Sequence, residues 1–250
     1  MLLRTAVRHL STQSGSLRNV AVVLSGSGVY DGSEIHEASA CLVHLSRHSA
    51  SVRLFAPDVA QKHVINHLTG EAMPETRNVL VESARIARGG QNISSLDKLQ
   101  VNQFQAIVLP GGFGAAKNLS TFAFDGEQMT VDERLEKILK EFHNSRKPIG
   151  LCCISPVIAA RLFPGAKITL GKLKNLTDDE AKNVFPYTGA VLSARQMGAE
   201  TQECDVNQVC VDEKQRIVTT PAFMKNASFH EVYDGIGLMI EKVVQLIGKK

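Results

Sequence analysis

The stretch that decides the fold is Lys147-Pro148-Ile149-Gly150-Leu151-Cys152-Cys153-Ile154-Ser155-Pro156. Its apolar part, residues 148–151, predicts a buried strand. Pro156–Leu162 predicts a helix, because proline is tolerated in a first helical turn. A strand that turns sharply into a helix, with cysteine at the turn, is the arrangement of a nucleophile elbow. Such a turn exposes the side chain, and the amino end of the helix stabilises a thiolate.

Of the two adjacent cysteines, Cys153 is the predicted nucleophile. It stands three residues before Pro156, whereas Cys152 still belongs to the strand and is interpreted as a small buried side chain. The amide of Ile154 is expected to point at a developing oxyanion. We expect a second donor from Gly111 or Gly112, where glycine lets the backbone approach closely.

The rest of the chain alternates short apolar runs with amphipathic stretches. This alternation predicts an α/β fold, a parallel sheet sandwiched between helices in a single domain, residues 19–250. Expected strands are Val20–Leu24, Val52–Phe55, Ala106–Leu109, Lys167–Leu170, Glu200–Cys204, Val209–Val211 and Ile217–Thr219. Further expected helices are Ser33–His48, capped by Ser33, then Val131–His143 and Phe229–Ile247. Residues 63–103 are mixed and read as an insertion over one edge of the sheet.

The glycine loop after the first strand, Gly26-Ser27-Gly28-Val29-Tyr30-Asp31, has the context of a dinucleotide fingerprint but lacks its third glycine. Asp31, Glu34 and Glu37 crowd the start of the next helix and would repel a pyrophosphate. A nucleotide site is therefore disfavoured. The same carboxylates are suited to holding a proton near a nucleophile.

The amino terminus has the composition of a mitochondrial transit peptide. Residues 1–18 contain Arg4, Arg8 and Arg18 with several serines, and no acid precedes Asp31. We therefore expect a transit peptide over residues 1–18 and a mitochondrial, matrix location, which also fits five cysteines without a disulfide pattern. Loss of these three arginines would bring the formal charge of +3 to zero.

Composition excludes several other classes of protein. The 250 residues are 44% hydrophobic and 21% charged, as in ordinary globular chains, and no apolar run is long enough to span a membrane. The small net charge gives no basic stripe for nucleic acid. The pairs His44/His48 and His63/His67 lack an evident third ligand, so no metal site is predicted. Lys117 and Asn118 are expected at the pocket, where Lys117 would lower the pKa of Cys153.

Several motifs resemble the class I glutamine-amidotransferase-like superfamily, which includes PfpI-type proteins and the Parkinson's-associated deglycase. Within it the chain is most similar to the ElbB branch and its vertebrate mitochondrial relatives, from about Asn19 to the carboxyl terminus. The resemblance lies in the cysteine elbow and in residues 22–26, 28–32, 34–38, 55–58, 65–67, 75–80, 110–119 and 218–222. It implies a flavodoxin-like sheet and a homodimer, with no cofactor.

The resemblance also implies that a glutamate after the first strand hydrogen-bonds the sulfur of Cys153. That glutamate is Glu37 or Glu34, and the distance to the second strand favours Glu37. The family's activating histidine is missing from its usual places. Residues 219–224 contain none, Ile154 directly follows the cysteine, and Gly171 and Lys172 follow the strand expected at 167–170.

Two classes of function fit these residues. The first is a slow, cofactor-free glyoxalase or deglycase acting on small reactive aldehydes, with Cys153 as nucleophile and Glu37 as proton shuttle. Amidotransferase and protease activities are not expected, because their histidine is absent. The second is a non-catalytic redox or metabolite sensor, or a scaffold in mitochondrial homeostasis or morphology, in which oxidative stress converts Cys153 to a sulfinate.

Overall fold

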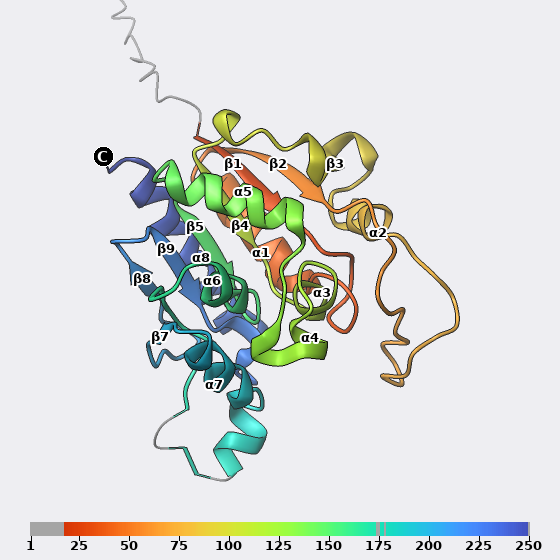
Figure 1. Ribbon diagram of the computed structural model, residues 1–250, viewed down its shortest axis with the longest axis vertical. Helices are drawn as coiled ribbons and strands as arrows, with labels where there is room; N and C mark the ends of the chain where they lie inside the picture. Colours follow the sequence, from red (N-terminus) through yellow and green to blue (C-terminus); the bar gives the residue numbers. More distant parts are fainter. Residues whose placement is uncertain (1–17, 174–175, 178, 250) are drawn as a thin grey trace, which may run out of the picture.

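A seven-stranded sheet forms the centre of the molecule in the computed structural model, which describes residues 18–249 except 174, 175 and 178 (Figure 1). Its order is β3-β2-β1-β4-β5-β9-β8. The strands are β1 (Arg18–Val23), β2 (Ala50–Ala56), β3 (Ile93–Ser95), β4 (Ala106–Leu109), β5 (Ile149–Cys152), β8 (Cys210–Asp212) and β9 (Ile217–Thr220). All pairs are parallel except the β8–β9 hairpin. The predicted α/β class with a largely parallel sheet is confirmed.

The strand order determines where a ligand can bind. Apart from the short edge strand β3, the chain places β2 on one side of β1 and β4, β5 and β9 on the other, which is the flavodoxin-like order. In such sheets the crevice lies outside the carboxyl ends of the strands where the order reverses. The loops after β1, β4 and β5 meet there.

Helices cover both faces of the sheet. Helices α1 (Ile35–Arg47) and α8 (Phe229–Ile247) pack on each other behind the sheet, while α5 (Glu133–Asn144) and α6 (Pro156–Leu162) lie in front of it (Figure 1). For α1, α5 and α6 this division follows from right-handed crossovers that run in opposite directions from β1 and from β4, whereas α8 follows the last strand. All residues of β4, β5 and β9 are buried, as a sheet covered on both faces requires.

The remaining elements are short. They comprise α2 (Val79–Ile86), α3 (Phe113–Lys117), α4 (Phe122–Asp125), α7 (Thr188–Gln196), a π-helix (Glu180–Val184) and 3-10 turns at 90–92, 96–98, 101–103, 126–128 and 222–224. The expected strands at 167–170 and 200–204 shrink to β6 (Lys167–Ile168) and β7 (Glu200–Thr201), which pair in a separate small sheet. Of residues 63–103, β3 adds an edge strand beside β2.

The N-cap of helix α1 lies one residue later than predicted. The side chain of Glu34, and not that of Ser33, caps the helix by accepting from the amide of Glu37 at 2.6 Å. The Ser33 hydroxyl instead accepts from the amide of Ser25 at 2.9 Å, so it is already used by the preceding turn. This cap holds the backbone of Glu37 in the first turn of α1, where its side chain is buried.

Residues 1–17 of the predicted transit peptide lie outside the described residues, and Arg18 is the first residue of β1. No helix within the described part of the chain has the length and apolar character needed to cross a membrane.

Candidate active site

Cys153 occupies a strained turn between β5 and α6. Its φ of +59° is in the left-handed region, which a residue other than glycine adopts at a cost of roughly 1–3 kcal/mol. The Cys153 amide donates to the Thr220 carbonyl at 3.1 Å, and the Ser155 hydroxyl donates to the Leu109 carbonyl at 3.0 Å. These bonds hold the turn to β9 and β4. The geometry is that of the predicted elbow.

The two cysteines have different surroundings. Cys153 is 8% exposed and lines a pocket, whereas Cys152 is fully buried as the last residue of β5. A hydrogen bond with the Cys41 thiol and burial raise the pKa of Cys152 well above its usual range. Cys153 is therefore the thiol that a ligand can reach.

Glu37 is fully buried beside both cysteines, and the Cys152 thiol lies 3.9 Å from its Oε2. Its Oε2 accepts from the Gly111 amide at 3.0 Å, and its Oε1 accepts from the Phe223 amide at 3.2 Å. Burial and then the nearby charge of Glu34 raise the pKa of Glu37 to about 8, although its hydrogen bond with Cys153 acts in the opposite direction. Glu37 is thus largely protonated at neutral pH.

Cys153 is also held in its neutral form. Burial first, and then the charge of Glu37, raise the pKa of its thiol well above the usual range. The amides of Gly112 and Ile154 hydrogen-bond the sulfur and lower the pKa, as expected for the start of a helix, but they are outweighed. The resting site is a neutral thiol beside a protonated carboxyl.

The predicted oxyanion donors divide into two groups. The amides of Gly112 and Ile154 reach the sulfur and remain near any group bonded to it. The amide of Gly111 is instead engaged by Glu37. A Cβ at position 111 would collide with the Cys153 Cβ and lie 2.6 Å from Glu37 Oε2, so glycine here permits the acid–thiol contact.

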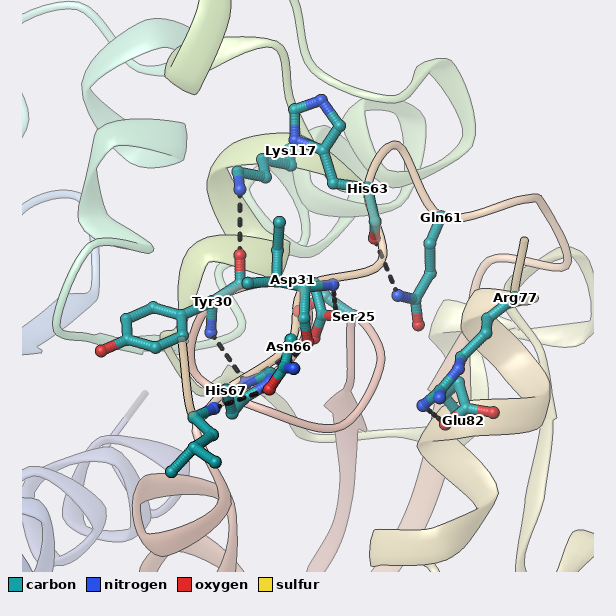
Figure 2. Close-up of polar contacts among 12 residues, drawn as sticks. Ser25, Tyr30, Asp31, Gln61, His63, Asn66, His67, Arg77, Glu82 and Lys117 are labelled. Carbon is teal, nitrogen blue, oxygen red and sulfur yellow. Dashed lines mark hydrogen bonds and ion pairs between the residues drawn. The ribbon is translucent and has the colours of Figure 1, made fainter. Parts of the chain in front are cut away.

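Glu34 and the two residues at the carboxyl end of α3, Lys117 and its C-cap Asn118, have structural contacts. Glu34 lines the pocket and caps α1. Asn118 donates to the carbonyls of Ser25 and Asp31 at 2.9 Å, and Lys117 donates to the Tyr30 carbonyl at 2.9 Å, as Figure 2 shows for Lys117. Neither Lys117 nor Asn118 is among the described residues lining the pocket.

These contacts correct the sequence interpretation of Lys117 and Asn118. Both fasten the β1–α1 loop, and Lys117 is not among the causes of the shifted Cys153 pKa. The same loop is fastened from its other side, because Asp31 accepts from the Ile65 amide at 2.7 Å and the Tyr30 amide donates to His67 Nε2 at 3.2 Å (Figure 2). The rigid loop places Val29 and Tyr30 in the pocket wall.

The sequence interpretation missed His36. This residue lines the same pocket as Cys153, and its Nδ1 lies 2.8 Å from Glu34 Oε1. Its ring packs against Phe229 with centroids 4.5 Å apart. The interpretation sought an imidazole only after the cysteine or late in the chain, although the motif Glu34-Ile35-His36-Glu37 contained one. A ligand at Cys153 therefore shares its pocket with a histidine that a carboxylate orients.

The pocket itself is large and mainly apolar, with a volume of about 540 Å³. Its described lining consists of Val29, Tyr30, Glu34, His36, Gly112, Phe113, Ala116, Phe122, Ala123, Cys153, Ile154, Pro186, Tyr187, Gly189, Ala190, Phe223, Met224, Asn226 and Phe229. Across residues 18–249, apart from the three undescribed positions, no cluster of His, Cys, Asp or Glu could hold a metal ion. The arrangement can bind a small organic molecule next to a cysteine.

Sequence comparison identifies the family. No family model matches the chain. It is 50% identical to the ES1 protein homolog, mitochondrial, of Rattus norvegicus, over 98% of this chain and 91% of that protein. It is 51% identical to glutamine amidotransferase-like class 1 domain-containing protein 3, mitochondrial, of Homo sapiens, over 98% and 88% of the two chains. This chain belongs to the ES1 family. The predicted resemblance to mitochondrial members of the amidotransferase-like superfamily is thereby confirmed.

Solved structures agree with this family. An isoprenoid biosynthesis protein with an amidotransferase-like domain from Ehrlichia chaffeensis is 35% identical, covers 92% of this chain and 99% of its own, and superposes with a TM-score of 0.79. Glyoxalase III from Candida albicans covers 92% and 97% with a TM-score of 0.55. Its 16% identity shows a common fold alone.

Proposed function

We propose that this protein is a slow, cofactor-free mitochondrial enzyme that converts 2-oxoaldehydes into 2-hydroxy acids through Cys153 and Glu37. The observation that carries the proposal is the buried Glu37 carboxyl, which two backbone amides hold against the elbow cysteine at the wall of a pocket. The fold shared with a glyoxalase III and the mitochondrial names of the relatives support it.

The proposed chemistry needs no oxidant. The Cys153 sulfur bonds to the aldehyde carbon, and the aldehyde oxygen receives the thiol proton, which gives a hemithioacetal. A proton then leaves that carbon and another is added to the neighbouring ketone carbon, while the hydroxyl proton passes to the former ketone oxygen. The resulting thioester is cleaved by water, which releases the 2-hydroxy acid and restores the thiol.

Glu37 is suited to moving these protons. A group with a pKa of about 8 is near the value at which general acid–base catalysis is effective close to neutral pH. The minority ionised form takes a proton from sulfur or carbon, and the protonated form returns it. The amides of Gly112 and Ile154 then stabilise oxygen that becomes negative during the shift.

His36 is a second proton-transfer group in this proposal. Its Nδ1 donates to Glu34 Oε1, so Nε2 is left as an acceptor in the tautomer that this bond favours. A histidine oriented by a carboxylate is the usual partner of an enzymatic nucleophile. His36 thus supplies an imidazole that the family's usual positions lack.

A redox sensor has less support from the same site. Oxidation of cysteine begins from the thiolate, and burial together with Glu37 raises the pKa of Cys153 well above its usual range. The thiol should therefore react slowly with dilute peroxide. A carbonyl compound held in the pocket gains from proximity, which offsets a small thiolate population.

Consumption of methylglyoxal and glyoxal by the full chain tests the proposal, with Cys153→Ala and Cys152→Ala as the decisive pair. Buffer and free-thiol controls are needed, since both react with these aldehydes. We expect turnover to be lost in Cys153→Ala and retained in Cys152→Ala, with the 2-hydroxy acid as product. Consumption no faster than that of Cys153→Ala would contradict the proposal.

A further inference from the structure

The pocket beside Cys153 is much larger than the smallest 2-oxoaldehydes require. Its volume of about 540 Å³ lies within the range of roughly 300–1,000 Å³ that encloses drug-sized ligands. A three-carbon aldehyde bonded to Cys153 would leave most of this space to water. The volume therefore fits a carbonyl compound with a substantial substituent.

The lining indicates the chemistry of that substituent. Large apolar side chains from separate segments surround the space: Phe113, Phe122, Tyr187, Phe223, Met224 and Phe229. The rings of Phe113 and Tyr187 meet edge to face with centroids 6.2 Å apart, and those of Phe223 and Phe229 do so at 5.9 Å. Such walls favour another ring, which can stack or pack edge-on.

The rim of the pocket is also apolar and open to solvent. Phe229 is 65% exposed and Tyr187 is 42% exposed, although both are large apolar side chains. A bound ring would remove part of this surface from water, which is the main source of free energy in such binding. A ligand that covers the rim therefore binds more tightly than one that reaches only Cys153.

Charge in the pocket disfavours acidic substituents. Among its described lining residues Glu34 is a carboxylic acid, and none is lysine or arginine. The ammonium group of Lys117 lies 5.4 Å from the Phe113 ring but donates to the Tyr30 carbonyl. Apart from His36, which is already hydrogen-bonded to Glu34, no described side chain of the wall could form an ion pair with a phosphate or carboxylate group.

We infer that the site selects 2-oxoaldehydes that carry an uncharged, ring-sized apolar substituent. This inference rests on the proposed function and names its substrate class. The difference between a phenyl and a methyl substituent in an apolar pocket predicts a kcat/KM about 10–100-fold higher for phenylglyoxal than for methylglyoxal. The chemical steps are unchanged, because only the group attached to the ketone differs.

The kinetic test compares the two aldehydes in matched variants. Gly189 lines the pocket, and a Cβ there meets open space, so Gly189→Leu narrows the pocket without a backbone clash. Phe229→Ala removes part of the apolar rim, and Phe124→Ala removes an exposed ring that is not among the lining residues. We expect the phenylglyoxal-to-methylglyoxal ratio of kcat/KM to fall at least about fivefold in the first two variants and to stay unchanged in Phe124→Ala. Because His36 packs on Phe229, the ratio is the relevant quantity and not either rate alone.

A binding measurement keeps the inference testable if neither aldehyde is turned over. Acetophenone carries the phenyl group of phenylglyoxal on an unreactive ketone, and acetone carries the methyl group of methylglyoxal. Their dissociation constants for the Cys153→Ala variant can be measured by ligand-observed NMR. We expect acetophenone to bind at least about tenfold more tightly, with the advantage reduced in Cys153→Ala/Gly189→Leu. Equal affinities, or a methylglyoxal kcat/KM equal to that of phenylglyoxal, would overturn the inference. Absence of turnover with both aldehydes would overturn the proposed function, while selective acetophenone binding would still support the pocket's preference.

Discussion

Replacing Glu37 by glutamine should make protein stability less dependent on pH, and the sign of its effect should reverse within the accessible range. The carboxyl pKa rises from 4.5 to about 8 on folding, chiefly because it is buried. Between these two values the folded protein keeps a proton that the unfolded chain releases. The free energy of unfolding of the wild type therefore falls as pH rises, by about 1.4 kcal/mol per pH unit for this group. Across the whole window the loss is on the order of 5 kcal/mol.

A glutamine at position 37 does not titrate, so it adds no pH dependence to the free energy of unfolding, but it loses a hydrogen bond. The two Glu37 oxygens accept from separate amides, those of Gly111 and Phe223, and an amide side chain offers one oxygen. The amide left without an acceptor costs about 1–3 kcal/mol at every pH. The variant should therefore be less stable than the wild type at pH 5 and more stable at pH 8, with the two curves crossing near about pH 6.

Urea unfolding at pH 5, 6, 7 and 8 measures this directly. Glu141→Gln is the control, because this carboxyl is exposed on α5. Its stability difference from the wild type should vary little with pH. A Glu37→Gln difference that stays constant from pH 5 to pH 8 would refute the reasoning, since it would mean that Glu37 is ionised in the folded protein.

Three further predictions concern the elbow and the loops around it. Gly111→Ala should lower the free energy of unfolding in urea by about 1–3 kcal/mol, because its Cβ collides with Cys153; wild-type stability would contradict this. Mass spectrometry should show that iodoacetamide modifies Cys153 at pH 7 at least about tenfold more slowly than it modifies a free thiol, and that the rate at Cys153 rises at pH 10. If Cys153 and the free thiol react equally fast at pH 7, the pKa of Cys153 is not raised. Lys117→Met should leave the pH profile of that labelling unchanged, because the lysine bonds the Tyr30 carbonyl; a shifted profile would restore the original expectation for Lys117.

The sequence was most informative where strands are buried on both faces. The bounds predicted for Ala106–Leu109, Pro156–Leu162 and Phe229–Ile247 are those observed. An apolar run defines the strand, a first-turn proline marks the start of α6, and a capping box marks the start of α8. The sequence defines no elements within residues 63–103. Residues 63–78 contain no helix or strand and are held by individual contacts, such as that of Asp31 with the Ile65 amide. Contacts of this kind leave no regular pattern in the sequence. From Val79 onward the elements α2 and β3 are short, so their apolar patterns are brief.

In the candidate site, the position of the cysteine was predictable and the contacts around it were not. A residue at a turn between strand and helix has a position that local sequence specifies, and Cys153 has the expected geometry. The roles of Lys117 and Gly111 depend on contacts with residues that are distant in sequence, Tyr30 and Glu37. His36 is close in sequence to Glu34, but its place in the pocket depends on its packing against Phe229. Sequence spacing could not show that Glu37 occupies the Gly111 amide or that Glu34 orients His36.

The stability cost of this site bears on its function. Cys153 has a left-handed backbone, position 111 has no room for a side chain, and burial raises the pKa of Glu37 to about 8. The left-handed backbone of Cys153 and the burial of the Glu37 carboxyl each cost free energy, and packing does not require both at one end of the sheet. The Gly111 and Phe223 amides give Glu37 a structural role, but a neutral acceptor in its place could pair with one of them without a raised pKa. The coincidence of strain, a buried acid and an open apolar pocket therefore favours a reacting or ligand-binding role for Cys153 over a structural one.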